Sequence, residues 1–161
     1  MIYPNQCRAG LEILEAFKKK NKHVILLAQT QSGKTGVTKY VAAKAENKIK
    51  ISTSNIYLIC GMNDNDLKKQ SINEFRGILS AKNILYSIDL QEANAGYSEI
   101  DCQLLMIDES HYAGLQDSHI DKFIKKFNPK YQLSVSATPM AELVSSKNNN
   151  KYFVYLEAHR K

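Results

Sequence analysis

The chain has 161 residues, enough for one domain with a buried core. Hydrophobic residues make up 43% and charged residues 24%, the balance of a soluble globular protein, and the longest strongly apolar run, 24–28, is far too short to span a membrane. The formal net charge of +6 favours polyanionic partners such as nucleic acid. No secretory signal pattern opens the chain and its three cysteines have no metal-ligand or redox spacing, so we expect a cytoplasmic protein.

Hydrophobic spacing predicts helices and strands that alternate along the chain. A first helix is expected over about 5–20, a buried strand over 23–28, and a second helix from about Lys34. The later strands are expected at 56–60, 83–88, 103–107, 132–135 and 152–156, with helices up to about Phe75 and over about 120–127. This alternation predicts an α/β fold, a mostly parallel sheet with helices on both faces, in which ligands bind at the carboxyl ends of the strands.

A phosphate loop is predicted at 28–35, Ala-Gln-Thr-Gln-Ser-Gly-Lys-Thr, where the first strand leads into a helix. The segment matches the pattern G-x-x-x-x-G-K-[ST], except that Ala28 replaces the first glycine. Gly33 lets the backbone N–H groups turn toward phosphate oxygens, and the helix N-terminus favours an anion. Lys34 can reach the β- and γ-phosphates and Thr35 can ligate magnesium, so the expected cofactors are ATP and Mg²⁺. The predicted phosphate-binding residues are Gln31, Ser32, Gly33, Lys34 and Thr35.

Two carboxylates, Asp108 and Glu109, end the strongly apolar segment 104–107. A strand that ends in solvent would also carry such residues, but their combination with a phosphate loop favours a magnesium–nucleotide site. There Asp108 can hold the metal through its water shell, and Glu109 can orient and deprotonate the attacking water. From these residues, the predicted catalytic residues are Lys34, Asp108 and Glu109, with Thr35 and Asp108 as the metal-binding pair.

These segments resemble the motifs of superfamily 2 helicases and translocases, in the order in which that family has them. The phosphate loop is similar to the A-Q-T-G-S-G-K-T form of DEAD-box helicases, and Asp-Glu-Ser-His at 108–111 is similar to the D-E-x-H form of motif II. The resemblance implies that His111 is also a catalytic residue and that it links the nucleotide site to motif III, which Ser-Ala-Thr at 136–138 matches. The hydroxyl groups of Ser136 and Thr138 would then hydrogen-bond motif II and couple its state to the partner domain.

The same resemblance implies that 1–161 forms a single RecA-like P-loop NTPase domain, the first motor domain of a DNA or RNA helicase or translocase. Gln6, with aromatic Tyr3 nearby, corresponds to the upstream glutamine that reads adenine; a surface glutamine at a helix start is the other interpretation. A second RecA-like domain, absent from 1–161, would supply an arginine finger that contributes about 10³ to 10⁵ in rate. We therefore expect very slow hydrolysis by this domain alone.

Nucleic-acid contacts are expected after the second strand, where the motor family meets the phosphate backbone. The expected residues are Gly61, Met62 and Asn63, with Lys68 and Lys69 on the following helix.

Two other functions share the same motifs. A viral DNA-packaging-type ATPase also pairs a phosphate loop with Asp-Glu and a small Ser/Thr motif. A nucleotide-binding module that needs a partner domain for activity would keep the phosphate loop without turnover of its own. A nuclease domain in the same protein would favour packaging, whereas a second RecA-like domain with an arginine-rich motif would favour the helicase.

Overall fold

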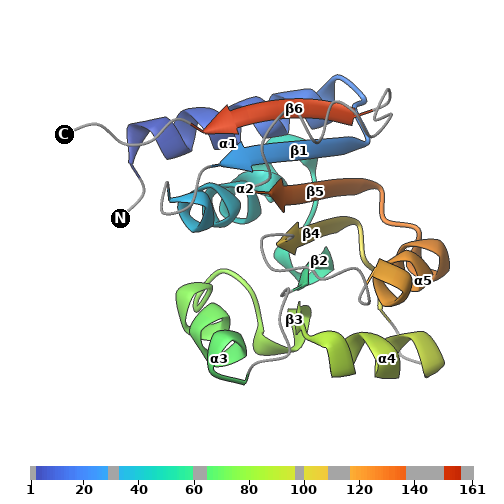
Figure 1. Ribbon diagram of the computed structural model, residues 1–161. Coiled ribbons are helices and arrows are strands. Elements are labelled where there is room, and N and C mark those ends of the chain that lie inside the picture. Colours follow the sequence, from blue (N-terminus) through green and yellow to red (C-terminus); the bar gives the residue numbers. More distant parts are fainter. Residues whose placement is uncertain are drawn as a thin grey trace.

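A computed structural model describes residues 3–28, 33–59, 65–96, 100–108, 117–136 and 151–156 (Figure 1). Its α-helices are α1 Pro4–Lys18, α2 Lys34–Ile49, α3 Asn65–Glu74, α4 Ser87–Ala95 and α5 Asp117–Phe127. Its strands are β1 His23–Ala28, β2 Ile56–Ile59, β3 Ile84–Leu85, β4 Leu104–Asp108, β5 Tyr131–Ser136 and β6 Lys151–Leu156. No helix within these ranges is long and apolar enough to cross a membrane.

The described strands form one parallel six-stranded sheet in the order β3-β2-β4-β5-β1-β6. β5 lies between β1 and β4, although it follows both of them in the chain. A strand inserted between the phosphate-loop strand and the acidic strand is typical of RecA-like P-loop domains, and the predicted fold class is confirmed. Because the strands all run the same way, their carboxyl ends share one edge of the sheet, the carboxyl edge, and their amino ends share the opposite, amino edge (Figure 1).

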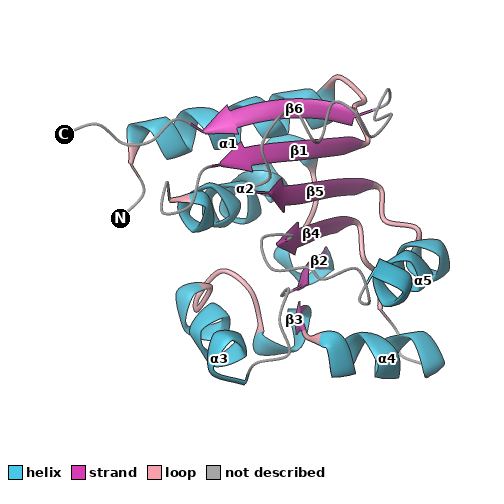
Figure 2. Ribbon diagram, viewed as in Figure 1, coloured by secondary structure: helices cyan, strands magenta, loops and turns pink. Residues whose placement is uncertain are grey.

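Helices cover both faces of the sheet (Figure 2). α1 and α2 pack on the face that carries Val24 and Leu26 of β1 and Met106 of β4. α4 and α5 pack on the other face, against Leu105 and Ile107 of β4. Successive residues of a strand point to opposite faces, so β4 is buried on both sides, which explains why its sequence is continuously apolar.

α1 and α2 lie side by side and run in the same direction. Near their N-terminal ends, the Gln6 side chain donates a hydrogen bond to the carbonyl oxygen of Gly33 at 2.8 Å. One turn further along α1, a Cβ added to Gly10 would lie 2.5 Å from Cδ1 of Tyr40. Glycine therefore permits the close approach of the two helices. Since α1 leads into the start of β1 and α2 leaves from its end, both helices finish at the amino edge.

The segment around β3 differs from the prediction. The sequence predicts a strand over 83–88, but β3 has only 2 residues and α4 follows it almost at once. The backbone N–H of Tyr86 donates to Oδ2 of Asp89 at 2.9 Å, a contact that stabilises the first turn of α4. Among the described side chains of α4, Leu90 and Ala93 are buried, and the apolar and polar residues of the helix do not segregate to opposite faces, so hydrophobic periodicity gives no signal for it.

Candidate nucleotide-binding site

The phosphate loop connects the carboxyl end of β1 to α2, and the structure describes it from Gly33 onward. Gly33 has φ 88° and ψ 30°, a left-handed conformation that glycine adopts without the steric penalty of other residues. Its carbonyl oxygen accepts a hydrogen bond from the Gly36 N–H at 3.0 Å. Lys34 and Thr35 therefore open a helix whose N-terminus attracts anions.

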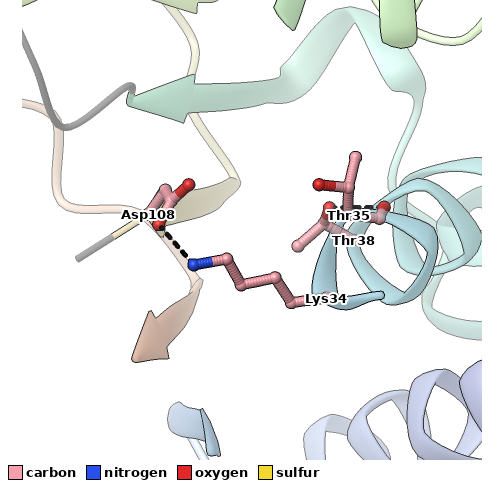
Figure 3. Close-up of polar contacts among 4 residues, drawn as sticks. All are labelled: Lys34, Thr35, Thr38 and Asp108. Atoms are coloured by element: carbon pink, nitrogen blue, oxygen red, sulfur yellow. Dashed lines mark hydrogen bonds and ion pairs between the residues drawn. The ribbon is translucent and has the colours of Figure 1, made fainter. Parts of the chain in front are cut away.

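Lys34 and Asp108 meet at the carboxyl edge. The side chain of Lys34 extends from the first turn of α2, and its Nζ lies 3.9 Å from Oδ1 of Asp108 at the end of β4 (Figure 3). The two side chains are 22% and 38% exposed, so both remain accessible to a ligand. The phosphate loop follows β1 and Asp108 ends β4, and β5 lies between these two strands. The ion pair therefore joins the phosphate loop to the acidic motif across β5.

The side chains at this edge fit a magnesium nucleotide by their chemistry. The Lys34 ammonium suits phosphate oxygens, and the Asp108 carboxylate and the Thr35 hydroxyl are the hard oxygen ligands that Mg²⁺ prefers. The Lys34–Asp108 distance of 3.9 Å is that of an ion pair, longer than the roughly 2.7–2.9 Å of a tight charge-assisted hydrogen bond. Thr38 Oγ1 donates to the Thr35 carbonyl oxygen at 2.8 Å and holds this first turn together (Figure 3).

Gln6 is buried, with 6% of its surface exposed, beside the phosphate loop. Its Nε2 donates to the Gly33 carbonyl oxygen at 2.8 Å, and its Oε1 accepts a hydrogen bond from the Tyr3 backbone N–H at 2.7 Å. A Cβ added to Gly36 would lie 2.5 Å from that Oε1. Gly36 lies outside the phosphate-loop pattern, which ends at Thr35. A glycine in the first turn of a helix costs about 1 kcal/mol relative to alanine, and this is the signal that points to such a close approach.

Ser136 ends β5 at the same edge of the sheet. It is opposite Leu27 of β1, and the residue before it, Val135, is opposite Asp108 of β4. Ser136 is 2% exposed. The fold thus brings the first residue of the motif III match close to the strand end that carries Asp108.

Several predicted site residues lie outside the described residues. They are Gln31, Ser32, Gly61, Met62, Asn63, Glu109, His111 and Thr138. Lys68 and Lys69 lie in α3, which follows β2; Lys69 is exposed, and the Lys68 side chain is not described. Since β2 runs parallel to β4, the last residue of β2, Ile59, lies at the carboxyl edge, and α3 follows it in the chain.

Comparison with models of protein families assigns the chain to one family. A family model described as type III restriction enzyme, res subunit, matches residues 1–103, more than half of the chain. The chain belongs to this family. The ATPase domain of this family is a helicase-like domain of superfamily 2. The resemblance to superfamily 2 that the motifs indicate is therefore confirmed, without a subtype within it. The residues matched to the res-subunit family include the phosphate loop and end before Asp108.

Comparison with individual proteins adds less. No curated protein matches the chain. Among solved structures, the chain is similar to that of PCH-2 from C. elegans, with 13% sequence identity and a TM-score of 0.38. The similarity covers 93% of this chain and 40% of that chain, so this chain spans about two fifths of the length of the other.

Proposed function

We propose that this chain is the ATP-binding domain of a superfamily 2 motor that couples ATP hydrolysis to movement on DNA or RNA. The observation that carries the proposal is the 3.9 Å approach of Lys34 Nζ to Asp108 Oδ1 across β5. A chance lysine–threonine turn, or a strand that merely ends in solvent, gives no reason for these two side chains to meet. Membership of the helicase-like res-subunit family supports the same function.

Each residue has a distinct role in the proposed site. Lys34 binds the β- and γ-phosphates, while the backbone of 31–33 surrounds them. Thr35 and Asp108 hold Mg²⁺, which neutralises the phosphate charge when it is bound. Glu109, the residue after Asp108, orients the attacking water and accepts its proton.

Movement requires that the nucleotide site communicate with a partner. We assign this coupling to His111, Ser136 and Thr138, and Ser136 lies at the carboxyl edge beside the end of β4. A second RecA-like domain, in the same polypeptide or in another, supplies the arginine that completes the site for hydrolysis. The domain described here therefore binds ATP by itself and turns it over slowly.

Nucleic acid crosses the segment after β2 in this proposal. The contacting residues are Gly61, Met62 and Asn63, followed by Lys68 and Lys69 of α3. Contacts of this kind bind phosphate and sugar rather than base edges, as a motor that moves along any sequence requires. The formal net charge of +6 supports a polyanionic partner.

Replacement of Lys34 tests the nucleotide site. Lys34→Ala should lower the affinity for ATP and Mg²⁺ by roughly 10- to 100-fold, because a charge-assisted bond to phosphate contributes roughly 1.5–3 kcal/mol. The fold should persist, since this side chain is partly exposed and lies outside both apolar cores. Calorimetric titration of both proteins with ATP and Mg²⁺ measures the change, and an unchanged affinity contradicts the proposed site.

Two further variants separate binding from turnover. Lys39→Ala is the matched control, since Lys39 lies on the same helix but beyond its first turn, and it should bind ATP as the wild type does. Glu109→Gln keeps its shape and loses its ability to accept a proton, so ATP should bind while turnover stops once a second motor domain is supplied. Wild-type turnover by Glu109→Gln would assign the base to another residue.

A further inference from the structure

A group of lysines lies at the amino edge of the sheet, on the side opposite the nucleotide site. α1 and α2 run side by side in the same direction and both end at this edge, where β5 begins (Figure 1). We call these lysines the amino-edge cluster. Its members are Lys18, Lys19, Lys20, Lys22, Lys48, Lys50 and Lys130.

Hydrogen-bond and ring contacts fix the chain at Lys22 and beside Lys130. The Gln132 backbone N–H donates to the Lys22 carbonyl oxygen at 2.9 Å, which fixes the end of the α1–β1 connection beside β5. The Tyr131 ring packs on the Phe17 ring of α1, with centroids 4.8 Å apart. Lys130 Nζ lies 5.4 Å from the centroid of the Tyr131 ring, within cation–π range. The chain that carries Lys22 and Lys130 is thus packed against β5 and α1.

Two members of the cluster have backbone conformations that lysine rarely adopts. Lys20 has φ 71° and Lys50 has φ 61°, each at a helix C-terminus where glycine is the usual residue. A lysine that only balances the helix dipole could stand in the last turn, as Lys18 and Lys48 do. A lysine at a position that favours glycine indicates that its charge has a use beyond the helix.

The described carboxylates near these helix ends do not neutralise the cluster. Glu15 lies 3.8 Å from Nζ of Lys18, and Asp101 accepts a hydrogen bond from the Gln103 side chain at 3.4 Å. Together with the exposed Glu46, they are outnumbered by the lysines. The amino edge therefore carries a positive field.

We propose that the amino-edge cluster binds the phosphate backbone of duplex nucleic acid. The inference rests on the proposed motor function for the identity of its partner, and it adds a second contact surface away from the track after β2. Neighbouring helices lie about 8–10 Å apart, and a duplex presents one charge about every 1.7 Å of its axis, so several phosphates face the cluster at once. A membrane suits this edge less, because Tyr152 is the one exposed large apolar side chain described there.

Two double variants separate the charge from the backbone conformation. Lys20→Gln with Lys50→Gln removes two charges and keeps the left-handed positions occupied by a side chain. Lys20→Gly with Lys50→Gly removes the same charges and relieves the strain. Both should weaken binding to a short mixed-sequence duplex by roughly 10-fold at low salt, and both should lower the slope of log affinity against log salt by about 2. Only the glycine pair should raise the melting temperature, by roughly 2 °C per site.

A matched control changes the backbone without changing the charge. Asn128 has φ 44° after α5, and Asn128→Gly should leave duplex binding and its salt slope at wild-type values. Unchanged duplex affinity and salt slope in both double variants would overturn the inference. The inference would also be overturned if both double variants lost binding to vesicles of anionic lipid but kept their duplex affinity. That result would assign the cluster to a membrane.

Failure of the proposed function has a different signature. Lys68→Glu with Lys69→Glu should weaken the binding of single strands and leave duplex binding at the amino edge largely intact. A protein that binds both ligands, with duplex affinity insensitive to Lys20 and Lys50, contradicts only the amino-edge cluster. A protein that binds neither ligand contradicts the motor function as well.

Discussion

Gln6 and Gly36 make the contact through which α1 supports the phosphate loop. The Gln6 amide is held on one side by the Tyr3 backbone N–H and on the other by the Gly33 carbonyl oxygen. Gly36 carries no side chain, and the amide fills the space where a Cβ would stand. A buried amide with both of its polar atoms bonded is costly to displace. Gln6 therefore helps to fix Gly33 of the phosphate loop, a role separate from the adenine contact that the family resemblance implies.

A substitution at Gly36 should reveal this contact. Gly36→Ala should destabilise the protein by roughly 1–3 kcal/mol, because the new methyl group displaces the Gln6 amide and leaves its backbone partners unsatisfied. In a Gln6→Ala background the same change should be neutral or stabilising, since alanine is favoured over glycine in a helix by about 1 kcal/mol. Urea unfolding of the four proteins measures the coupling. Additive effects would show that Gln6 does not compete for this space.

Among the elements, α4 and α5 are joined by one lysine of α5. Lys126 Nζ donates hydrogen bonds to the carbonyl oxygens of Ala93 at 3.1 Å, Asn94 at 3.0 Å and Gly96 at 2.8 Å. The last carbonyl groups of a helix lack partners within it, so a cation there satisfies them and balances the helix dipole. Asn94 Nδ2 donates in turn to the His119 carbonyl oxygen at 3.0 Å. The helix pair covers the face of β4 that carries Leu105 and Ile107.

Removal of this cation should loosen α4. Lys126→Met keeps most of the apolar stem and should lower the free energy of unfolding by about 1 kcal/mol, because the C-terminal end of α4 loses its charged donor. Amide hydrogen exchange in α4 and α5 should rise more than exchange in β1. Lys125→Met, at the exposed neighbouring position, is the control and should change neither quantity. Equal effects of the two substitutions would rule out the capping role.

At the scale of the whole molecule, burial of the Cys102 thiol makes the stability of the fold depend on pH. It lies just before β4 in the core under α4 and α5 and is 3% exposed. Burial, with a smaller contribution from the charge of Asp101, raises the pKa of the thiol to about 12. The thiol donates a weak hydrogen bond to the Leu104 carbonyl oxygen at 3.7 Å. Cys7 and Cys102 are both free thiols, and Cys102 stays protonated and unreactive while the protein is folded.

This pKa predicts a loss of stability at high pH. The thiol has an ordinary pKa of 9.0 when the chain is unfolded and about 12 when it is folded, so between these values the unfolded state binds fewer protons. The free energy of unfolding should therefore fall as the pH rises through this window. Urea unfolding below and above pH 9.0 should show a steeper decline for the wild type than for Cys102→Ala. Equal declines would assign the effect to other groups, such as Tyr57, whose pKa burial also raises.

The sequence alone predicts those features that depend on residues close together in the chain. The apolar run of β1, the glycine and lysine that follow it and the start of α2 form one continuous pattern, and the structure has each element where the pattern predicts it. The prediction was wrong around 83–88, where a strand of 2 residues and a helix without an apolar stripe leave no periodic signal. Local periodicity reports an element only when one face of it is buried over several turns or pleats.

Packing between distant segments accounts for the rest. Nothing in the spacing of residues places β5 between β1 and β4, yet this order brings Lys34 within 3.9 Å of Asp108. The two partners of the Gln6 amide, and the meeting of the lysine-rich ends of α1 and α2, depend in the same way on how the helices dock. Such contacts form because burial of both sheet faces and the handedness of parallel crossovers select one arrangement of the whole chain. A linear pattern carries no information about which of its distant parts will lie together.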